Sequence, residues 1–272
     1  MKFDIKGNPN GPIVVCIHGL MGAPDDFRPF IEAWGKEFKL LIPELADIGT
    51  NVSGYGINVD GKERLIYEFS APKIIEYLQQ NYPGKKPFFA GISYGGKITI
   101  QIAETYPEFF GAGVVTDVGV GPLGKSSGLF KFVFEVVPKL NFNQPWKELR
   151  KDLKKQIPDP MLRILIQSHI HYDSKDAPSG TWKGHAYNFD SLLKNSRLEN
   201  QWGQVDRIQA PIYIFKATED SAIDENDYSE MQKYDCFKFI TLEGANHFIQ
   251  INNCDDFRDR TLALIEDFYE IQ

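Results

Sequence analysis

A serine flanked by glycines is the residue in this chain whose type and setting point most directly to covalent chemistry. Ser93 lies in Gly91-Ile92-Ser93-Tyr94-Gly95-Gly96, between an apolar run and a segment of helical period. In a sharp turn from strand to helix, a serine is held with its Oγ exposed above the sheet. Side chains at Gly91 and Gly95 would collide in so tight a turn, so glycine is expected there. The pattern predicts that Ser93 is a nucleophile, with the positive end of the following helix beneath it.

A serine hydroxyl is a weak nucleophile, so the site needs a base that a third group orients. The sequence offers five histidines. His247 follows an apolar run far downstream of Ser93 and is the candidate base. His169 and His171 are close enough in sequence to suggest a metal pair, but no carboxylate motif accompanies them. His185 is expected to pack among aromatic residues.

The acid that would orient His247 has three candidates. Asp220 is preferred, because it follows the apolar run 212–215 and precedes His247 in the chain. Asp224 lies four residues later and could instead cap the next helix. Asp117, at the end of the preceding apolar run, is the third candidate.

A second glycine-containing loop could stabilise the negative oxygen that forms during acyl transfer. His18-Gly19-Leu20-Met21-Gly22 follows a buried run and opens such a loop. Two backbone N–H groups are expected to form this oxyanion hole, one from Tyr94 and one from Leu20, with Met21 as the alternative. His18 and Gly19 would then shape the loop, and His18 would not transfer protons.

These groups need a scaffold that brings distant segments together. Short apolar runs alternate with segments of helical period, which favours a parallel sheet covered by helices on both faces. Strands are expected over 12–17, 39–43, 87–92, 113–118, 212–215 and 237–242. Helices are expected to begin near Pro24 and Ser70 and to cover 94–106, 225–233 and 255–270. The glycine-rich stretch 47–61 is expected to be a loop.

The strand signals stop between residues 119 and 208. Apolar residues there recur at helical spacing and favour two or more amphipathic helices. We interpret 119–208 as a helical cap inserted into a core made of 1–118 and 209–272. Its apolar side chains could line an acyl pocket or form the core of the cap itself; they include Phe130, Val133, Phe134, Val137, Met161, Leu162, Leu165 and Ile166.

Taken together, these stretches resemble the α/β-hydrolase superfamily over nearly the whole chain, and most closely its small esterase and acyl-hydrolase branch. The matching segments are His18-Gly19, the Ser93 motif, Thr116-Asp117-Val118-Gly119 before the cap, Asp220 and Gly244-Ala245-Asn246-His247. The resemblance implies an α/β fold with a mostly parallel, eight-stranded sheet. It also implies a mechanism without cofactor or metal, and a cap over the site.

The chemistry expected from these residues is hydrolysis of a carboxylic ester or thioester through an acyl-enzyme, with a small to medium acyl substrate. Other serine-dependent reactions of this fold are alternatives, namely C–C bond hydrolysis, amide hydrolysis and acyl transfer. A receptor-like protein that binds a ligand with negligible turnover is an alternative of a different class.

The amino-acid composition and charge limit which classes of binding partner are expected. The formal net charge of −7 argues against a nucleic-acid binder. No apolar run approaches the ~18 residues of a membrane span, and no secretory signal is visible, so a cytoplasmic protein is expected. The three cysteines fit no disulfide framework. One basic cluster at near-helical spacing could be a solvated helix face or could dock an acidic carrier such as acyl carrier protein; it consists of Lys147, Arg150, Lys151, Lys154 and Lys155.

Overall fold

The computed structural model describes most of the chain. The described residues are 1–19, 22–45, 52–53, 56–59, 62–121, 136, 139–158, 160–168, 170–174, 176–182 and 201–270. Several residues singled out from the sequence lie outside them, namely Leu20, Met21, Phe130, Val133, Phe134, Val137, His169 and His185.

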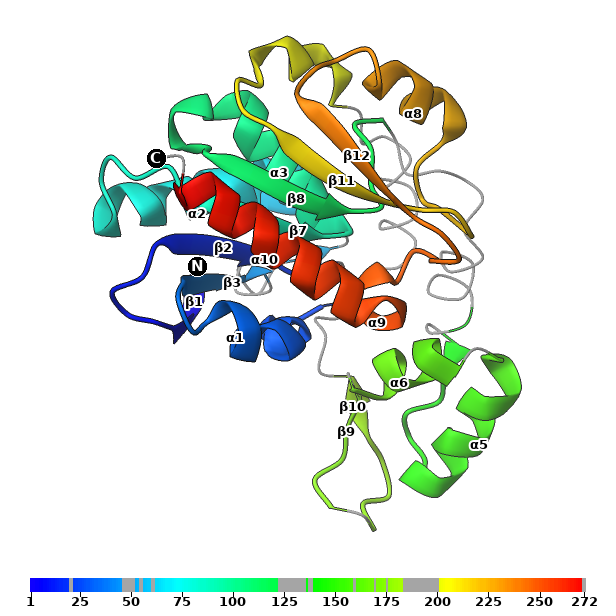
Figure 1. Cartoon of the computed structure of the whole chain (residues 1–272). Helices are drawn as coiled ribbons and strands as arrows, with labels where there is room; N and C mark the ends of the chain where they lie inside the picture. Colours follow the sequence, from blue (N-terminus) through cyan, green and yellow to red (C-terminus); the bar gives the residue numbers. More distant parts are fainter. Residues whose placement is uncertain are drawn as a thin grey trace.

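A single large sheet forms the centre of the molecule (Figure 1). Among the described residues it has seven strands, in the order β1-β3-β2-β7-β8-β11-β12. The strands are β1 (Lys2–Gly7), β2 (Ile13–Ile17), β3 (Lys39–Glu44), β7 (Phe88–Ile92), β8 (Ala112–Thr116), β11 (Ile212–Ala217) and β12 (Phe237–Leu242). The strand β1 pairs antiparallel with β3 and the other neighbours pair in parallel. The expectation of a mostly parallel sheet is confirmed, and among the described residues the sheet has seven strands where eight were expected.

The central strands are buried on both sides because helices cover both faces. On one face, α1 (Arg28–Trp34) and α10 (Cys254–Glu270) pack aromatic side chains such as Trp34 and Phe257 onto the sheet. On the other face lie α2 (Ile66–Asn81) and α3 (Tyr94–Thr105), together with α8 (Glu225–Met231). This layering explains why β2, β7 and β8 consist entirely of buried residues.

Short elements complete the core. They are the 3₁₀ helices η1 (Pro24–Phe27), η3 (Pro107–Phe109) and η6 (Trp202–Arg207), and the short helix α9 (Ile249–Asn252). The described part of the chain contains no helix that is long and apolar enough to cross a membrane.

The stretch 47–61 departs from the expected loop. It contributes to a small antiparallel sheet of β4 (Val52–Ser53), β5 (Gly56–Val59) and β6 (Lys62–Leu65). The sequence carries Asp60-Gly61 between β5 and β6, which is one of the strongest short-range signals for a hairpin. Glycine content alone therefore misled the prediction.

Between β8 and η6 the chain forms a smaller lobe to one side of the sheet (Figure 1). It contains α5 (Trp146–Gln156), α6 (Pro160–Ser168) and a pair of two-residue strands, β9 (Ile170–His171) and β10 (Thr181–Trp182). Helices were expected here and strands were not. The helix α5 buries Leu149 and Leu153 and exposes its basic residues, as its helical period requires.

Candidate active site

Ser93 occupies a sharp turn between β7 and α3. Its backbone has φ 50° and ψ −114°, a conformation that few residues with a side chain adopt. A Cβ atom at Gly91 would lie 2.5 Å from the carbonyl oxygen of Gly95, and one at Gly95 would overlap the carbonyl oxygen of Ile17. The strained turn is held by the Ser93 N–H, which donates to Thr116 Oγ1 over 2.9 Å. The two glycines are therefore required by close packing of the turn.

His247 lies beside this serine, although 154 residues separate the two in the chain. Ser93 Oγ and His247 Nε2 are 2.8 Å apart. The imidazole is buried, whereas Ser93 is partly exposed. A buried ring next to an accessible hydroxyl suits transfer of the hydroxyl proton to Nε2.

The other ring nitrogen of His247 is held by Asp117. The Nδ1 atom lies 2.9 Å from Asp117 Oδ2. This carboxylate comes directly after β8 and is completely buried. Because Nδ1–H donates to a carboxylate, Nε2 is left to accept a proton from Ser93.

Asp117 is surrounded by hydrogen-bond donors. Its Oδ1 accepts from the Ala217 N–H over 3.0 Å and from Ser221 Oγ over 2.6 Å, and its Oδ2 accepts from the Ala222 N–H over 2.8 Å. Burial by itself raises the pKa of Asp117, but the hydrogen bonds from His247, Ser221 and Ala222 outweigh it, so the pKa lies below its ordinary value. Asp117 is therefore a carboxylate at neutral pH.

The sequence favours Asp220 as the acid, whereas the structure places the Asp117 carboxylate 2.9 Å from His247 Nδ1. Asp220 lies in the exposed turn after β11, with φ 50°, and it is Asp117 that accepts the hydrogen bond from His247 Nδ1. Asp224 caps α8, where its Oδ1 accepts from the Asn226 N–H over 2.9 Å. The physical reason is that β8 and β11 are parallel neighbours, so their carboxyl ends meet at one edge of the sheet. An acid after either strand could reach His247, and the turn 219–222 supplies hydrogen-bond donors to Asp117.

The loop after β2 lies against the Ser93 turn. A Cβ atom at Gly19 would lie 3.5 Å from Ser93 Cβ. His18 is buried behind this loop, where its Nε2 accepts from the Leu45 N–H over 3.2 Å and its Nδ1 lies 2.9 Å from the Gly19 oxygen. With Nε2 as acceptor, Nδ1 carries the proton and donates to Gly19. This arrangement fits the expectation that His18 shapes the loop.

Of the two expected oxyanion donors, Tyr94 lies within the described residues. It is the first residue of α3, and the first N–H groups of a helix have no acceptor within the helix. Tyr94 directly follows Ser93 in the chain, and its role as an oxyanion donor stays a prediction. The contribution of Leu20 stays a prediction from the sequence.

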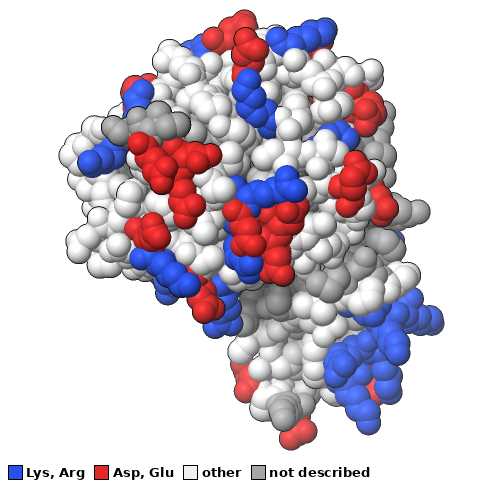
Figure 2. All heavy atoms as spheres, viewed as in Figure 1, with Lys and Arg blue, Asp and Glu red and all other residues white. Residues whose placement is uncertain are grey.

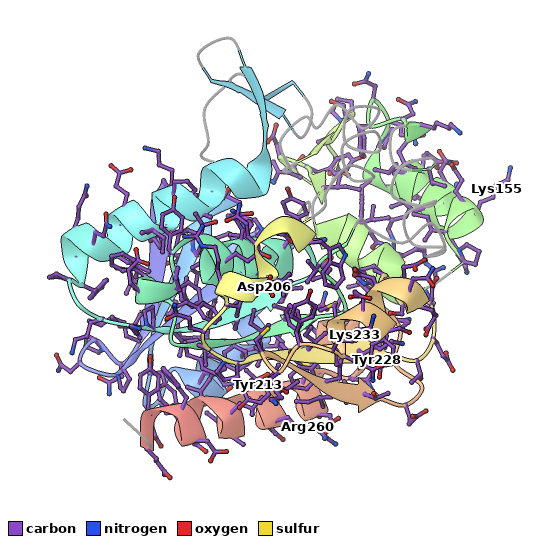
Figure 3. All side chains as sticks on the ribbon, turned by 90° about the horizontal axis from the view of Figure 1, so that it is seen from above. Lys155, Asp206, Tyr213, Tyr228, Lys233 and Arg260 are labelled. Atoms are coloured by element: carbon purple, nitrogen blue, oxygen red, sulfur yellow. The ribbon has the colours of Figure 1, made fainter. Side chains whose placement is uncertain are left out.

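The basic cluster lies on α5, away from the Ser93 turn. Figure 2 shows Lys and Arg gathered at the end of the molecule where Figure 1 places α5, and Figure 3 shows Lys155 pointing outward. All five basic residues are exposed, and Lys151 pairs with Glu148 over 2.8 Å. Docking of an acidic carrier on α5 stays a prediction. His171 is exposed too, with Nε2 3.2 Å from Asp173 Oδ1.

Comparison with known proteins agrees with this architecture. The family model described as the alpha/beta hydrolase fold matches residues 12–253. The chain belongs to the α/β-hydrolase family. The matched range includes the Ser93 turn, Asp117 and His247.

Relatives of this α/β-hydrolase carry esterase and lipase names. A protein of Haemophilus influenzae named as an esterase/lipase is 22% identical over 254 residues, covering 92% of this chain and 82% of the relative. A thermostable monoacylglycerol lipase of Bacillus sp. strain H-257 is 30% identical over 107 residues, covering 38% of this chain and 39% of the lipase. These relatives support a hydrolase of the esterase/lipase type.

Solved structures show the same fold. A marine microorganism esterase has a TM-score of 0.75 at 20% identity, and the match covers 96% of this chain and 98% of the esterase. An E-2-(acetamidomethylene)succinate hydrolase has a TM-score of 0.69 at 15% identity, covering 98% and 95% of the two chains. At these identities the likeness concerns the fold.

Proposed function

We propose that this α/β-hydrolase cleaves a carboxylic ester of small to medium acyl chain, with Ser93 as nucleophile, His247 as base and Asp117 as the orienting acid. The observation that carries the proposal is the continuous pair of hydrogen bonds from Ser93 Oγ through His247 to Asp117. The esterase and lipase names of the relatives favour an ester over other acyl substrates.

In the first step, Ser93 Oγ attacks the ester carbonyl while His247 Nε2 takes the hydroxyl proton. The bond to the alcohol then breaks, and His247 returns the proton to the leaving oxygen, which leaves an acyl group on Ser93. In the second step, His247 activates a water that attacks the acyl carbonyl and releases the acid. The Tyr94 N–H, and Leu20 by the sequence argument, would stabilise the negative oxygen, each by roughly 3–4 kcal/mol.

Asp117 contributes through its charge. When His247 gains a proton, the ring becomes positive inside a buried site, which is unfavourable without a nearby anion. The lowered pKa of Asp117 keeps this anion in place throughout the reaction. The same carboxylate also fixes the ring orientation through Nδ1.

We further propose that residues 119–208 form a cap that contributes to substrate binding. This segment leaves the core at the carboxyl end of β8, the sheet edge at which the Ser93 turn and Asp117 lie. Leu149, Leu153 and Ile166 from it join the same apolar cluster as Tyr94. The acyl chain of the substrate would therefore meet both the core and the cap.

The proposal is tested with p-nitrophenyl esters of increasing acyl length, comparing the natural protein with Ser93→Ala. Turnover is expected in the natural protein and should fall on the order of a millionfold in the variant. Both the initial burst and the steady rate are recorded. Equal rates in the two proteins would exclude Ser93 as the nucleophile, and a burst without turnover would exclude an ordinary esterase.

A further inference from the structure

A buried lysine one helical turn beyond Ser93 takes no part in the proposed reaction. Lys97 lies on α3 and is 0% exposed. Its Nζ donates to the carbonyl oxygen of Val120 over 3.2 Å and to that of Gly121. These carbonyls belong to the chain as it leaves the core, three and four residues after Asp117. A fully buried ammonium group is unfavourable unless hydrogen bonds and a counter-charge compensate it.

The counter-charge comes from Asp227 on α8. Its Oδ1 accepts from the Gly121 N–H over 2.8 Å, its carboxylate attracts Lys97, and the Trp202 side chain donates to it. A Cβ atom at Gly119 would overlap Asp227 Oδ2, and one at Gly121 would lie 2.5 Å from Oδ1. The two glycines thus leave the room that this carboxylate fills.

One peptide group connects the two charges. The carbonyl of the Val120–Gly121 peptide accepts from Lys97, and the N–H of the same peptide donates to Asp227. The peptide dipole is therefore aligned between a cation and an anion in a desolvated setting, where such interactions are strong. The chain is fixed at this peptide from both sides.

The returning end of the chain is tied to the same place. The Gln201 N–H donates to the Val120 carbonyl over 3.0 Å, and Gln201 Nε2 donates to the Lys97 carbonyl over 2.9 Å. Trp202 follows directly and contacts Asp227. Both ends of the segment 122–200, the insertion, therefore meet at Lys97 and Asp227.

We propose that Lys97 and Asp227 form a clamp that fixes both ends of the insertion relative to Ser93 and thereby determines how tightly the acyl substrate binds. They are positioning residues. The effect on substrate binding rests on the proposed esterase function, whereas the fixing of the insertion does not. The clamp acts on KM more than on the chemical step, because Asp117 is held independently by Ala217, Ser221 and Ala222.

The test compares Lys97→Met, Asp227→Asn and the double variant, with Glu104→Gln as a matched control. Glu104 is also buried on α3, and burial raises its pKa to about 8, so glutamine replaces a neutral acid at pH 7. Four quantities are measured: kcat and KM for p-nitrophenyl acetate and octanoate, the rate at which a small organophosphorus reagent labels Ser93, and the melting temperature.

Lys97→Met is expected to raise KM for the octanoate by about tenfold and to leave Ser93 labelling within about twofold. The single variants should also melt at lower temperature, because each leaves one buried charge uncompensated. The double variant should regain much of the melting temperature but not the KM, because methionine cannot donate to the two carbonyls. If Lys97 and Asp227 had only a structural role, the melting temperature and the KM would both return toward the natural values in the double variant.

The clamp is refuted if KM changes no more in Lys97→Met than in Glu104→Gln, or if KM returns with stability in the double variant. Limited proteolysis adds a readout that does not need activity. Cleavage within 122–200 should be at least about fivefold faster in Lys97→Met than in the control. If the natural protein lacks esterase activity but this acceleration appears, the proposed function fails and the clamp stands.

Discussion

Two buried aspartates lie on either side of one short stretch of chain, and their acidities differ. Asp117 precedes Val118–Gly121, and Asp227 packs against that stretch from α8. Burial is the largest influence on both and raises the pKa. The donors around Asp117 reverse this effect, whereas Lys97, Gly121 and Trp202 do not reverse it for Asp227, whose pKa stays raised.

For these two carboxylates the hydrogen-bond donors, more than the depth of burial, account for the opposite directions of the pKa shifts. Asp117 accepts from a ring nitrogen, a hydroxyl and two backbone N–H groups. Such a set stabilises the charged form selectively. In the proposed mechanism Asp117 balances the transient positive charge of His247, and it is the aspartate with this set of donors.

The largest effect on activity is expected when Asp117 itself is changed. Asp117→Asn should lower kcat on the order of 10⁴-fold, because an amide can hold the wrong tautomer of His247 and cannot balance its charge. Asp220→Asn is the matched control, and asparagine tolerates the positive φ of that position. Steady-state kinetics check both. A larger loss in Asp220→Asn than in Asp117→Asn would return the acid role to Asp220.

An intermediate effect concerns pH and the buried Glu104. Its pKa is raised by burial from 4.5 to about 8, with Lys97 and Arg207 opposing the rise, and it raises the pKa of the neighbouring Cys236. The folded chain therefore binds this proton more tightly than the unfolded chain does. Its contribution is fully present below the unfolded pKa and is lost as pH rises toward about 8, by about 1.4 kcal/mol for each pH unit.

Glu104→Gln should remove this loss. Urea unfolding of both proteins at a series of pH values between about 5 and 8 measures it, and the free energy of unfolding should fall less with pH in the variant. Parallel curves for the two proteins would show that Glu104 is ionised in the fold.

The smallest effect removes one donor from Asp117. Ser221→Ala deletes the hydroxyl that lies 2.6 Å from Oδ1 and leaves the Ala217 and Ala222 donors in place. The pKa of Asp117 should rise and kcat should fall about tenfold, since a hydrogen bond to a charged group contributes roughly 1.5–3 kcal/mol.

The sign of the accompanying pH effect is opposite to that of Glu104. A carboxylate with a lowered pKa adds stability above its unfolded pKa of 3.8, and this stability is lost as pH falls. In Ser221→Ala this contribution should be smaller, so the acid unfolding transition should move to higher pH, as acid titration followed by circular dichroism would show. An unchanged acid transition together with unchanged kcat would mean that the other donors suffice.

The sequence predicted much of this arrangement. The strand β12 and the start of α3 fall where hydrophobic period and glycine placed them. Ser93 and His247 meet as the two motifs implied, because each follows a strand of one parallel sheet. Sequence could not choose between Asp117 and Asp220, since both follow neighbouring strands and only the side-chain contacts separate them.

Other features could not be predicted because they depend on contacts between distant residues and not on the local sequence pattern. The strand β1 pairs only with β3 in the described sheet, and most of its residues are exposed. Its sequence therefore lacks the apolar run by which the buried strands were predicted. The clamp was also invisible, because Lys97 looks like any polar residue of an amphipathic helix until its partners at 120–121 and 227 are known.

The short distance in sequence between Asp117 and Gly121 has a consequence for recombination among related chains. Exchange of the segment 122–200 would keep the acid, both glycines, Gln201 and Trp202, and so would carry a foreign insertion onto intact anchor points. Exchange at 119–208 would replace the glycines that accommodate Asp227 and the glutamine that returns the chain to α3. Crossovers at 121 and 201 are therefore expected to keep the contacts of Lys97 and Asp227, whereas wider ones would replace the residues that make those contacts.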